Sequence, residues 1–126
     1  MVDLSSLKNA RLHGGFVIDE VELTAEPIVD AMGRVAVART RIVGRHFHLL
    51  IRSELDEREI SMTLYHEILE AASVASLRPP AAVCDSNEAD FERAAHKMHE
   101  ELGVASAGTL NRMLQSFGFG EEYGHG

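Results

Sequence analysis

The sequence predicts an α+β fold for residues 1–126, with a small antiparallel sheet of about three strands followed by three helices. In the first half of the chain, apolar and polar residues alternate with the period of two that is typical of strands. In the second half, apolar residues recur every three or four positions, which is the helical period. A length of 126 residues predicts a single domain with a substantial core, with residues 118–126 as a flexible tail.

Turn residues divide the first half of the chain into its expected strands. Residues 1–15 are polar and form a lead-in. Residues 16–23 are rich in β-forming side chains and predict the first strand. Two further strands are expected at 34–40 and 41–53, and Gly44 is interpreted as a bulge within the last of them.

Three helices are expected in the second half, at 57–76, 87–102 and 106–117. Ser53 or Asp56 can cap the first of these helices, because both side chains accept hydrogen bonds from free backbone N–H groups. Two consecutive prolines and Gly103 then separate the three helices from one another.

Composition narrows the possible partners and compartment. The formal net charge is −8, which disfavours binding to nucleic-acid phosphates, so no nucleic-acid partner is expected. Cys84 is the single cysteine, so no internal disulfide can form and a cytoplasmic location is expected. No apolar run has the length of a signal peptide or membrane span, so no membrane partner is expected. The protein is expected to be a monomer or a small homo-oligomer.

The most informative pattern lies in the first expected helix, where His66, Glu67 and Glu70 occur together. Residues four apart on a helix share one face, so the side chains of His66 and Glu70 project side by side. An imidazole and a carboxylate at this spacing can hold one divalent metal ion. The carboxylate of Glu67 flanks them and can accept a proton from metal-bound water. The alternative is a surface helix that carries solvated charges.

A metal at His66 and Glu70 needs a further ligand, and the second expected helix offers four candidates. Its polar stripe contains Glu88, Glu92, His96 and His99. The first and last of these are about 16 Å apart along a helix, so they cannot bind the same ion. The sequence leaves open which end of the stripe contributes. His46 and His48 also share a strand face, but a solvated face is the favoured interpretation there.

Residues 60–71, Ile-Ser-Met-Thr-Leu-Tyr-His-Glu-Ile-Leu-Glu-Ala, resemble the active-site helix of zincin-like metallopeptidases, especially small bacterial and phage members. Residues 87–91, Asn-Glu-Ala-Asp-Phe, are similar to the segment that supplies the third metal-binding glutamate in small zincins. The resemblance covers residues 41–98 and implies a minimal zincin-like fold. It implies that His66, Glu70 and Glu88 are metal ligands, and it makes Glu67 the general base.

The chain departs from the zincin pattern at two positions. Glu70 stands where the family has a second histidine, and Phe91 comes one residue early in the second motif. Zinc is the metal that the resemblance implies. A His/Glu/Glu ligand set is harder and more anionic than His/His/Glu, so manganese, iron or calcium are alternatives.

Three functional hypotheses follow. The first is a minimal metal-dependent peptidase that acts through metal-activated water, with residues 41–53 as an edge strand that holds an extended peptide. The second is an inactive zincin-fold binding or regulatory module, with or without metal. The third, a ferritin-like carboxylate site, is disfavoured because neither helix carries a Glu-x-x-His pair. Tyr65, Tyr123 and the histidines all remain candidates for stabilising an oxyanion.

Overall fold

A mixed four-stranded sheet frames the molecule in the computed structural model, which describes residues 2–30 and 32–120. The predicted α+β class is confirmed. The sheet has one more strand than expected and is mixed rather than purely antiparallel. In order across the sheet, the strands are β1 (Ala10–Arg11), β2 (Val17–Thr24), β6 (His46–Arg52) and β5 (Ala38–Val43).

The mixed pairing follows from the path of the chain. After β2 the chain leaves the sheet and returns on the far side of β6 as β5, so β2 and β6 run parallel. A tight turn at Gly44-Arg45 then reverses the chain, and β5 and β6 pair antiparallel. Gly44 adopts a φ of 62°, which favours glycine. The interpretation of Gly44 as a bulge is therefore wrong, and residues 41–53 are parts of two strands and a turn.

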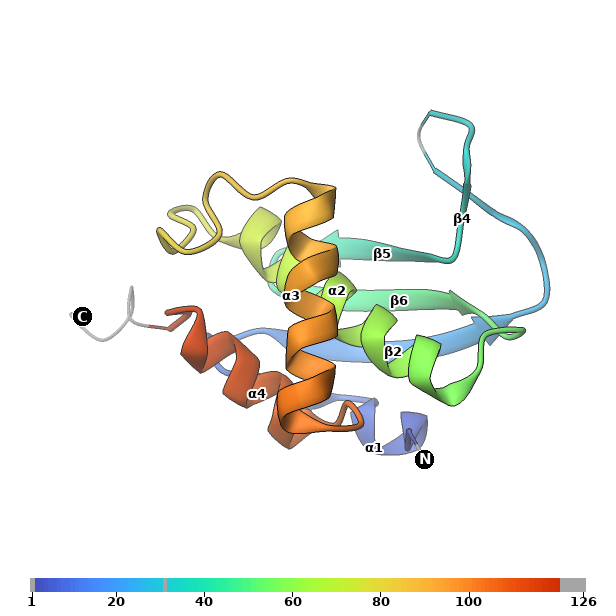
Figure 1. Cartoon of the computed structure of the whole chain (residues 1–126), viewed down its shortest axis with the longest axis horizontal. Coiled ribbons are helices and arrows are strands. Elements are labelled where there is room, and N and C mark those ends of the chain that lie inside the picture. Colours follow the sequence, from blue (N-terminus) through green and yellow to red (C-terminus); the bar gives the residue numbers. More distant parts are fainter. Residues whose placement is uncertain (1, 31, 121–126) are drawn as a thin grey trace.

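Between β2 and β5 the chain forms a projecting arm, made of β3 (Ile28–Val29) and β4 (Val35–Ala36) (Figure 1). Asp30 orders the end of the arm, because its Oδ1 accepts hydrogen bonds from the N–H groups of Met32 and Arg34. The expected strand at 34–40 is thus divided between β4 and the start of β5. The arm forms one wall of the groove described below.

Both ends of the described chain contribute to the core. Residues 1–15 are more than a lead-in, since they include helix α1 (Leu4–Leu7) and strand β1, and Leu12 is buried. Near the other end, Phe119 is fully buried and its ring meets that of Phe16 edge-on at 6.0 Å. The expectation of a flexible tail over 118–126 is therefore wrong at Phe119. Residues 121–126, with Tyr123, lie outside the described residues.

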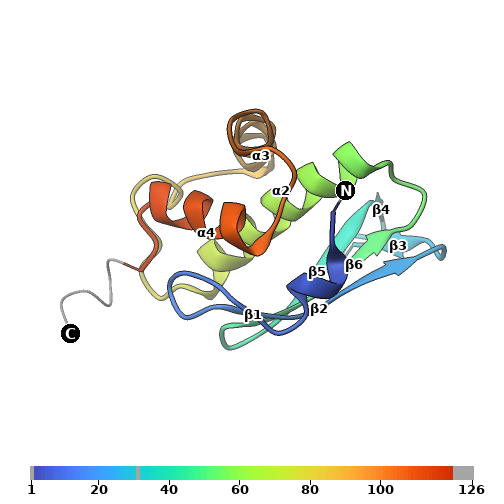
Figure 2. The ribbon, with the colours of Figure 1, turned by 90° about the horizontal axis from the view of Figure 1, so that it is seen from below.

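Three helices cover one face of the sheet, as predicted. Figure 2 shows α2 (Glu57–Ala75) lying between the sheet and α3 (Glu88–Leu102), with α4 (Ala107–Ser116) beside α2. Each helix begins with a capping box, in which the N-cap side chain and the third helical residue exchange hydrogen bonds. The N-cap residues are Asp56, Asn87 and Ser106.

One hydrophobic core joins the sheet to α2. Phe47, Leu49 and Ile51 project from β6 onto one face, as their alternation predicts, and all three are fully buried. Leu64 and Ile68 meet them from α2. The opposite side of α2 is left for α3, and this places α2 at the centre of the molecule. No helix in the described part of the chain combines the length and apolarity needed to cross a membrane.

Candidate metal centre

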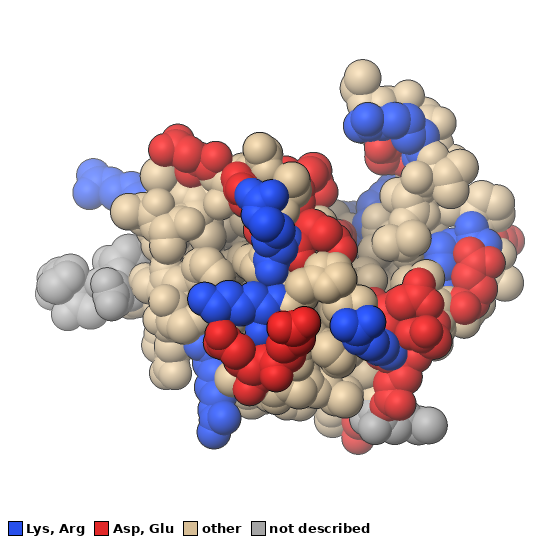
Figure 3. All heavy atoms as spheres, in the orientation of Figure 1, with Lys and Arg blue, Asp and Glu red and all other residues tan. Residues whose placement is uncertain are grey.

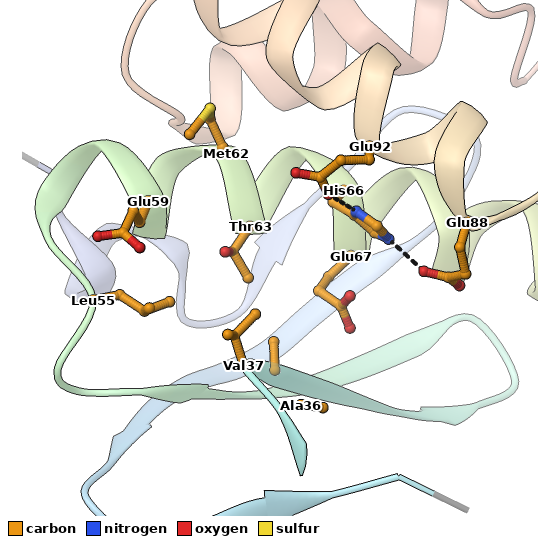
Figure 4. Close-up of a pocket in the computed structure, with 11 residues that line it drawn as sticks. Ala36, Val37, Leu55, Glu59, Met62, Thr63, His66, Glu67, Glu88 and Glu92 are labelled. Carbon is orange, nitrogen blue, oxygen red and sulfur yellow. Dashed lines mark hydrogen bonds and ion pairs between the residues drawn. The ribbon is translucent and has the colours of Figure 1, made fainter. Parts of the chain in front are cut away.

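The side chains of interest meet where the start of α3 crosses the middle of α2. His66, Glu67 and Glu70 come from α2. Glu88 and Glu92 come from the first two turns of α3, and Figure 4 shows them beside His66. The capping box at Asn87 fixes where α3 begins, so Glu88 and Glu92 share the helix face that is turned toward His66. The expected convergence of two helices at His66 is therefore present in the structure.

Both ring nitrogens of His66 face carboxylates. Nδ1 lies 2.8 Å from Oε2 of Glu92, and Nε2 lies 3.1 Å from Oε2 of Glu88. Oε2 of Glu70 is 3.7 Å from the same Nε2. The imidazole is mostly buried, with its side chain 13% exposed, and its ring lies beside that of Phe91. This packing leaves the ring little freedom to turn away from the carboxylates.

The carboxylates strongly favour the charged form of His66. Burial by itself lowers the pKa of the imidazole. Hydrogen bonds with Glu70 and Glu92, together with the nearby charge of Glu67, outweigh burial and raise the pKa to about 9. Without a metal ion, His66 is therefore an imidazolium at neutral pH that donates from both nitrogens.

Glu70 and Glu88 form a pair of carboxyl groups on the Nε2 side of His66. A hydrogen bond with Glu70, with burial as the next cause, raises the pKa of Glu88 to about 7. The hydrogen bond from His66 holds the pKa of Glu70 below its ordinary value. Two carboxyl groups that share one proton are a common arrangement where a cation can replace that proton.

Glu67 has a different environment from the other three glutamates. Its Oε1 accepts a hydrogen bond of 3.0 Å from the hydroxyl of Thr40 on β5. Burial raises the pKa of Glu67 above its ordinary value, and the hydrogen bond from Thr40 opposes that effect. A carboxylate with a raised pKa and a fixed orientation has the properties of a general base. Thr40 could not be identified from the sequence, because it is 27 residues from Glu67 and only the fold brings the two together.

The donor set fits a divalent metal ion. Ligand atoms of His66, Glu67 and Glu70 can all lie within 4.8 Å of one another. Two ligands bound tetrahedrally at zinc distances are about 3.4 Å apart. The separations of 3.1 and 3.7 Å from Nε2 to Glu88 and Glu70 lie on either side of that value. Glu92 holds the other ring nitrogen, as carboxylates commonly do behind metal-binding histidines.

The structure separates the candidates on α3 that the sequence left open. Glu88 faces the side of His66 that is available to a metal, and Glu92 faces the opposite nitrogen. His96 lies 3.2 Å from Glu92 and extends that side of the network. His99 is one turn further along and contacts Ser61 at 2.8 Å, away from the site.

Tyr65 is not available to stabilise an oxyanion. It is fully buried, and its hydroxyl donates to the carbonyl of Gly103 at 2.9 Å. This bond ties α2 to the end of α3, so the role of Tyr65 is structural. The phenol side chain occupies the core face of α2, whereas His66 occupies the face turned toward the groove.

On the outer face of the sheet, the histidines of β6 have acidic partners that the sequence analysis missed. His46 lies 2.7 Å from Asp19, and His48 lies 3.1 Å from Glu22. The parallel pairing of β2 with β6 brings these residues together. The acidic run Asp-Glu-Val-Glu at residues 19–22 was the available signal, but its use required the strand pairing. The His46 pair is well exposed, as a solvated face implies, but the side chain of His48 is only 27% exposed. His48 also forms a group with Glu20 and Glu22 whose ligand atoms lie within 4.8 Å of one another.

A groove runs past the candidate metal centre. Two cavities of about 370 and 690 Å³ flank it and share Ala36, Ala38, Glu67 and Glu88 in their walls. Figure 3 shows the hollow between the projecting arm and the body of the molecule, with acidic atoms on the side of the body. Strand β5 forms the edge of the sheet beside it, and no described strand pairs with its outer side.

Comparison with known proteins gives no match at the level of a protein family, a curated protein or a solved structure.

The charged cluster predicts a pH-dependent stability for the metal-free protein. The pKa of His66 rises from 6.5 in the unfolded chain to about 9 in the folded protein, so its stabilising contribution is complete below pH 6.5 and is lost as the pH rises to 9. The free energy of unfolding should fall by at most about 3 kcal/mol over this pH range. Urea unfolding in the presence of a chelator, at pH 6.5 and 9, measures it. His66→Gln should remove this part of the pH dependence, and an unchanged profile would contradict the assignment.

Proposed function

We propose that the protein is a metal-dependent hydrolase that cleaves peptides. The observation that carries this proposal is the convergence of His66 Nε2 with the carboxylates of Glu70 and Glu88, while Glu67 lies beside them and in the wall of a groove. In this proposal Glu67 is the base and not a ligand, although its carboxylate lies close to those of the ligands; hydrolysis by a metal-activated water requires such a base beside the ion. The similarity of residues 60–71 to the zincin active-site helix supports the same conclusion.

Each side chain has a separate role in this proposal. His66, Glu70 and Glu88 would hold the ion, and Glu92 would fix the orientation of the imidazole. A divalent ion, when bound by these residues, would lower the pKa of a water molecule and polarise the substrate carbonyl. Glu67 accepts the proton from the attacking water and passes it to the leaving amine. The hydrogen bond from Thr40 keeps the Glu67 carboxylate in place during both transfers.

The ligand chemistry limits the choice of metal without fixing it. One imidazole and two carboxylates fit zinc, which the zincin resemblance favours. The same set is hard and anionic enough to accept manganese, iron or calcium.

The edge strand β5 can position an extended peptide against these groups. The N–H of Arg52 donates to the carbonyl of Val37, so alternate residues of β5 face β6 and the backbone groups of Ala38 and Thr40 face the open edge. Peptide added at this edge would lie next to Glu67, because Thr40 contacts that side chain directly. The edge is formed by Ala38–Val43, whereas residues 46–52, expected at the edge, lie between two other strands.

A second function is also supported by a specific observation. In the absence of an ion, the imidazolium of His66 is already satisfied by three carboxylates on both of its nitrogens. A cluster of this kind can have a purely structural role, which is to hold α3 against α2. The protein would then be a non-catalytic binding or regulatory module.

Metal analysis combined with a peptide assay tests the two functions. The purified protein, without an affinity tag, is dialysed against zinc, manganese, iron or calcium and analysed for bound metal. Each loaded form is then incubated with a mixed peptide library. One equivalent of metal with cleavage that a chelator abolishes supports the hydrolase. Stable binding of metal without any cleavage supports the module.

Replacing Glu88 and Glu92, the two glutamates of α3 that contact His66, should distinguish the metal ligand from the residue that orients the imidazole. Glu88→Gln removes a charged ligand and should weaken metal binding by about 100-fold or more. Glu92→Gln leaves the ligands intact and should weaken it by about 10-fold, toward the lower end of the range for such outer partners. Competition with a chromophoric chelator measures both affinities. An effect of Glu92→Gln larger than that of Glu88→Gln would reverse the assignment.

A further inference from the structure

One part of the groove extends from the candidate metal centre along α2 toward the start of that helix. It is the cavity of about 370 Å³, and Glu59 lies near its far end (Figure 4). Leu55, Met62 and Val37 provide apolar surface between Glu59 and the metal centre. Val37 is 52% exposed, so the groove presents apolar surface that the protein itself does not cover. Its walls are suited to the hydrocarbon part of a side chain.

The charged side chains that line this cavity are almost all acidic. Four glutamates line it, and none of the described lining residues is lysine or arginine. A bound divalent ion would neutralise only two of these negative charges, so the groove remains anionic in the loaded protein. The carboxylate of Glu59 makes a hydrogen bond to the backbone N–H of Asp56 through Oε1, and Oε2 remains available to another donor.

The distance along α2 between Glu67 and Glu59 limits the length of a substrate side chain that can fit between them. Glu59 and Glu67 are eight residues apart, which is about 12 Å along a helix. A lysine or arginine side chain that begins beside Glu67 spans roughly half of this distance with its flexible stem. Glu59 lines the same cavity and offers its carboxylate to the cation at the end of that stem. The stem would then lie along the apolar residues, while the cation meets a carboxylate.

We infer that this cavity is a subsite for a lysine or arginine side chain adjacent to the bond that is cleaved. The inference rests on the proposed peptidase function and names its substrate class, extended peptides with a basic residue on one side of the cleavage site. The second cavity has a mixed lining, since Arg34 and Arg39 lie there together with four acidic residues. The first cavity has no lysine or arginine among its described lining residues, so the basic side chain is assigned to it.

Glu59→Gln is the variant that tests the subsite. Glutamine preserves the capping box at the start of α2, because its side-chain oxygen can still accept the hydrogen bond from Asp56. Glu101→Gln is the matched control, since it makes the same change in net charge on an exposed residue at the opposite end of α3 from Glu88. Both variants are compared with the parent protein in the zinc-loaded form.

The probes are three peptides that differ only at the residue beside the cleavage site, with lysine, norleucine or glutamate. Hydrolysis rates are measured with the parent, and binding is measured by calorimetry with the Glu67→Gln protein. We expect lysine to be favoured over norleucine by about 10-fold, with glutamate weakest. Glu59→Gln should reduce the lysine preference about threefold to fivefold, and Glu101→Gln should leave it unchanged.

The outcomes distinguish failure of the subsite from failure of the peptidase. Hydrolysis without a preference for lysine, or equal effects of the two variants, would overturn the subsite and leave the hydrolase intact. Binding that prefers lysine and depends on Glu59, but without any hydrolysis, would remove the proposed function and support the basic subsite in a binding module.

Discussion

Glu67→Gln should lower peptide hydrolysis by about 100-fold or more while the protein keeps its metal and its fold, because it removes only the general base. Glutamine has nearly the same size as glutamate, and its side-chain oxygen can still accept the hydrogen bond from Thr40. His66 has its ion pairs with Glu70, Glu88 and Glu92, whereas the hydrogen bond of the Glu67 side chain is with Thr40. Three measurements on the variant and the parent test this prediction. Metal content reports on the ligands, thermal melting reports on the fold, and turnover of the best peptide reports on the base.

Thr40→Val is a useful companion to that variant. Valine is similar in shape to threonine, but it removes the hydroxyl that fixes the Glu67 carboxylate. A loss of activity smaller than that of Glu67→Gln, with unchanged metal content, is expected. If Glu67→Gln instead releases the metal, Glu67 is a ligand. If it hydrolyses peptide at the parent rate, Glu67 has no role as a base.

The helices were predictable because their signals are local. Asp56 and Gly103 mark the start of α2 and the end of α3 through interactions within a few residues, and the apolar period between them identifies the buried face. The face assignment of β6 was likewise predictable from alternation alone, since Phe47 and Ile51 are buried as expected.

The order and direction of the strands depended on contacts between distant parts of the chain. Nothing near β2 in the sequence specifies that it pairs in parallel with β6, and the short arm of β3 and β4 separates the two. The same limitation affected the first residues, where Leu7 and Leu12 are isolated apolar positions in the sequence but fill the core from α1 and the segment that follows β1.

The candidate site shows the same division between local and distant information. The spacing of His66 and Glu70 on one helix is enough to predict that these two side chains lie together. The choice between Glu88 and Glu92 depended on how α3 is rotated about its axis against α2. That rotation is set by Phe91 and Ala95, which pack into the core.

His66→Ala should abolish metal binding, with a loss of affinity of about 100-fold or more, because it removes the only nitrogen ligand of the cluster. It should also destabilise the metal-free protein by about 1–3 kcal/mol near pH 6.5, since the carboxylates of Glu70 and Glu88 lose the cation between them. Stoichiometric zinc titration and urea unfolding measure the two effects.

His99→Ala is the matched control for this change. It removes an imidazole from α3 that the sequence offered as an alternative ligand, but that contacts Ser61 instead of the cluster. The loss of this contact should lower stability by about 1 kcal/mol, and metal binding should be unaffected. The hydrolase and the non-catalytic module both predict that His66→Ala is less stable than the parent, so stability alone does not distinguish these two functions. Metal binding that depends on His66 and not on His99 is required by the hydrolase, and a His66→Ala protein that binds zinc like the parent would exclude this site as the metal centre.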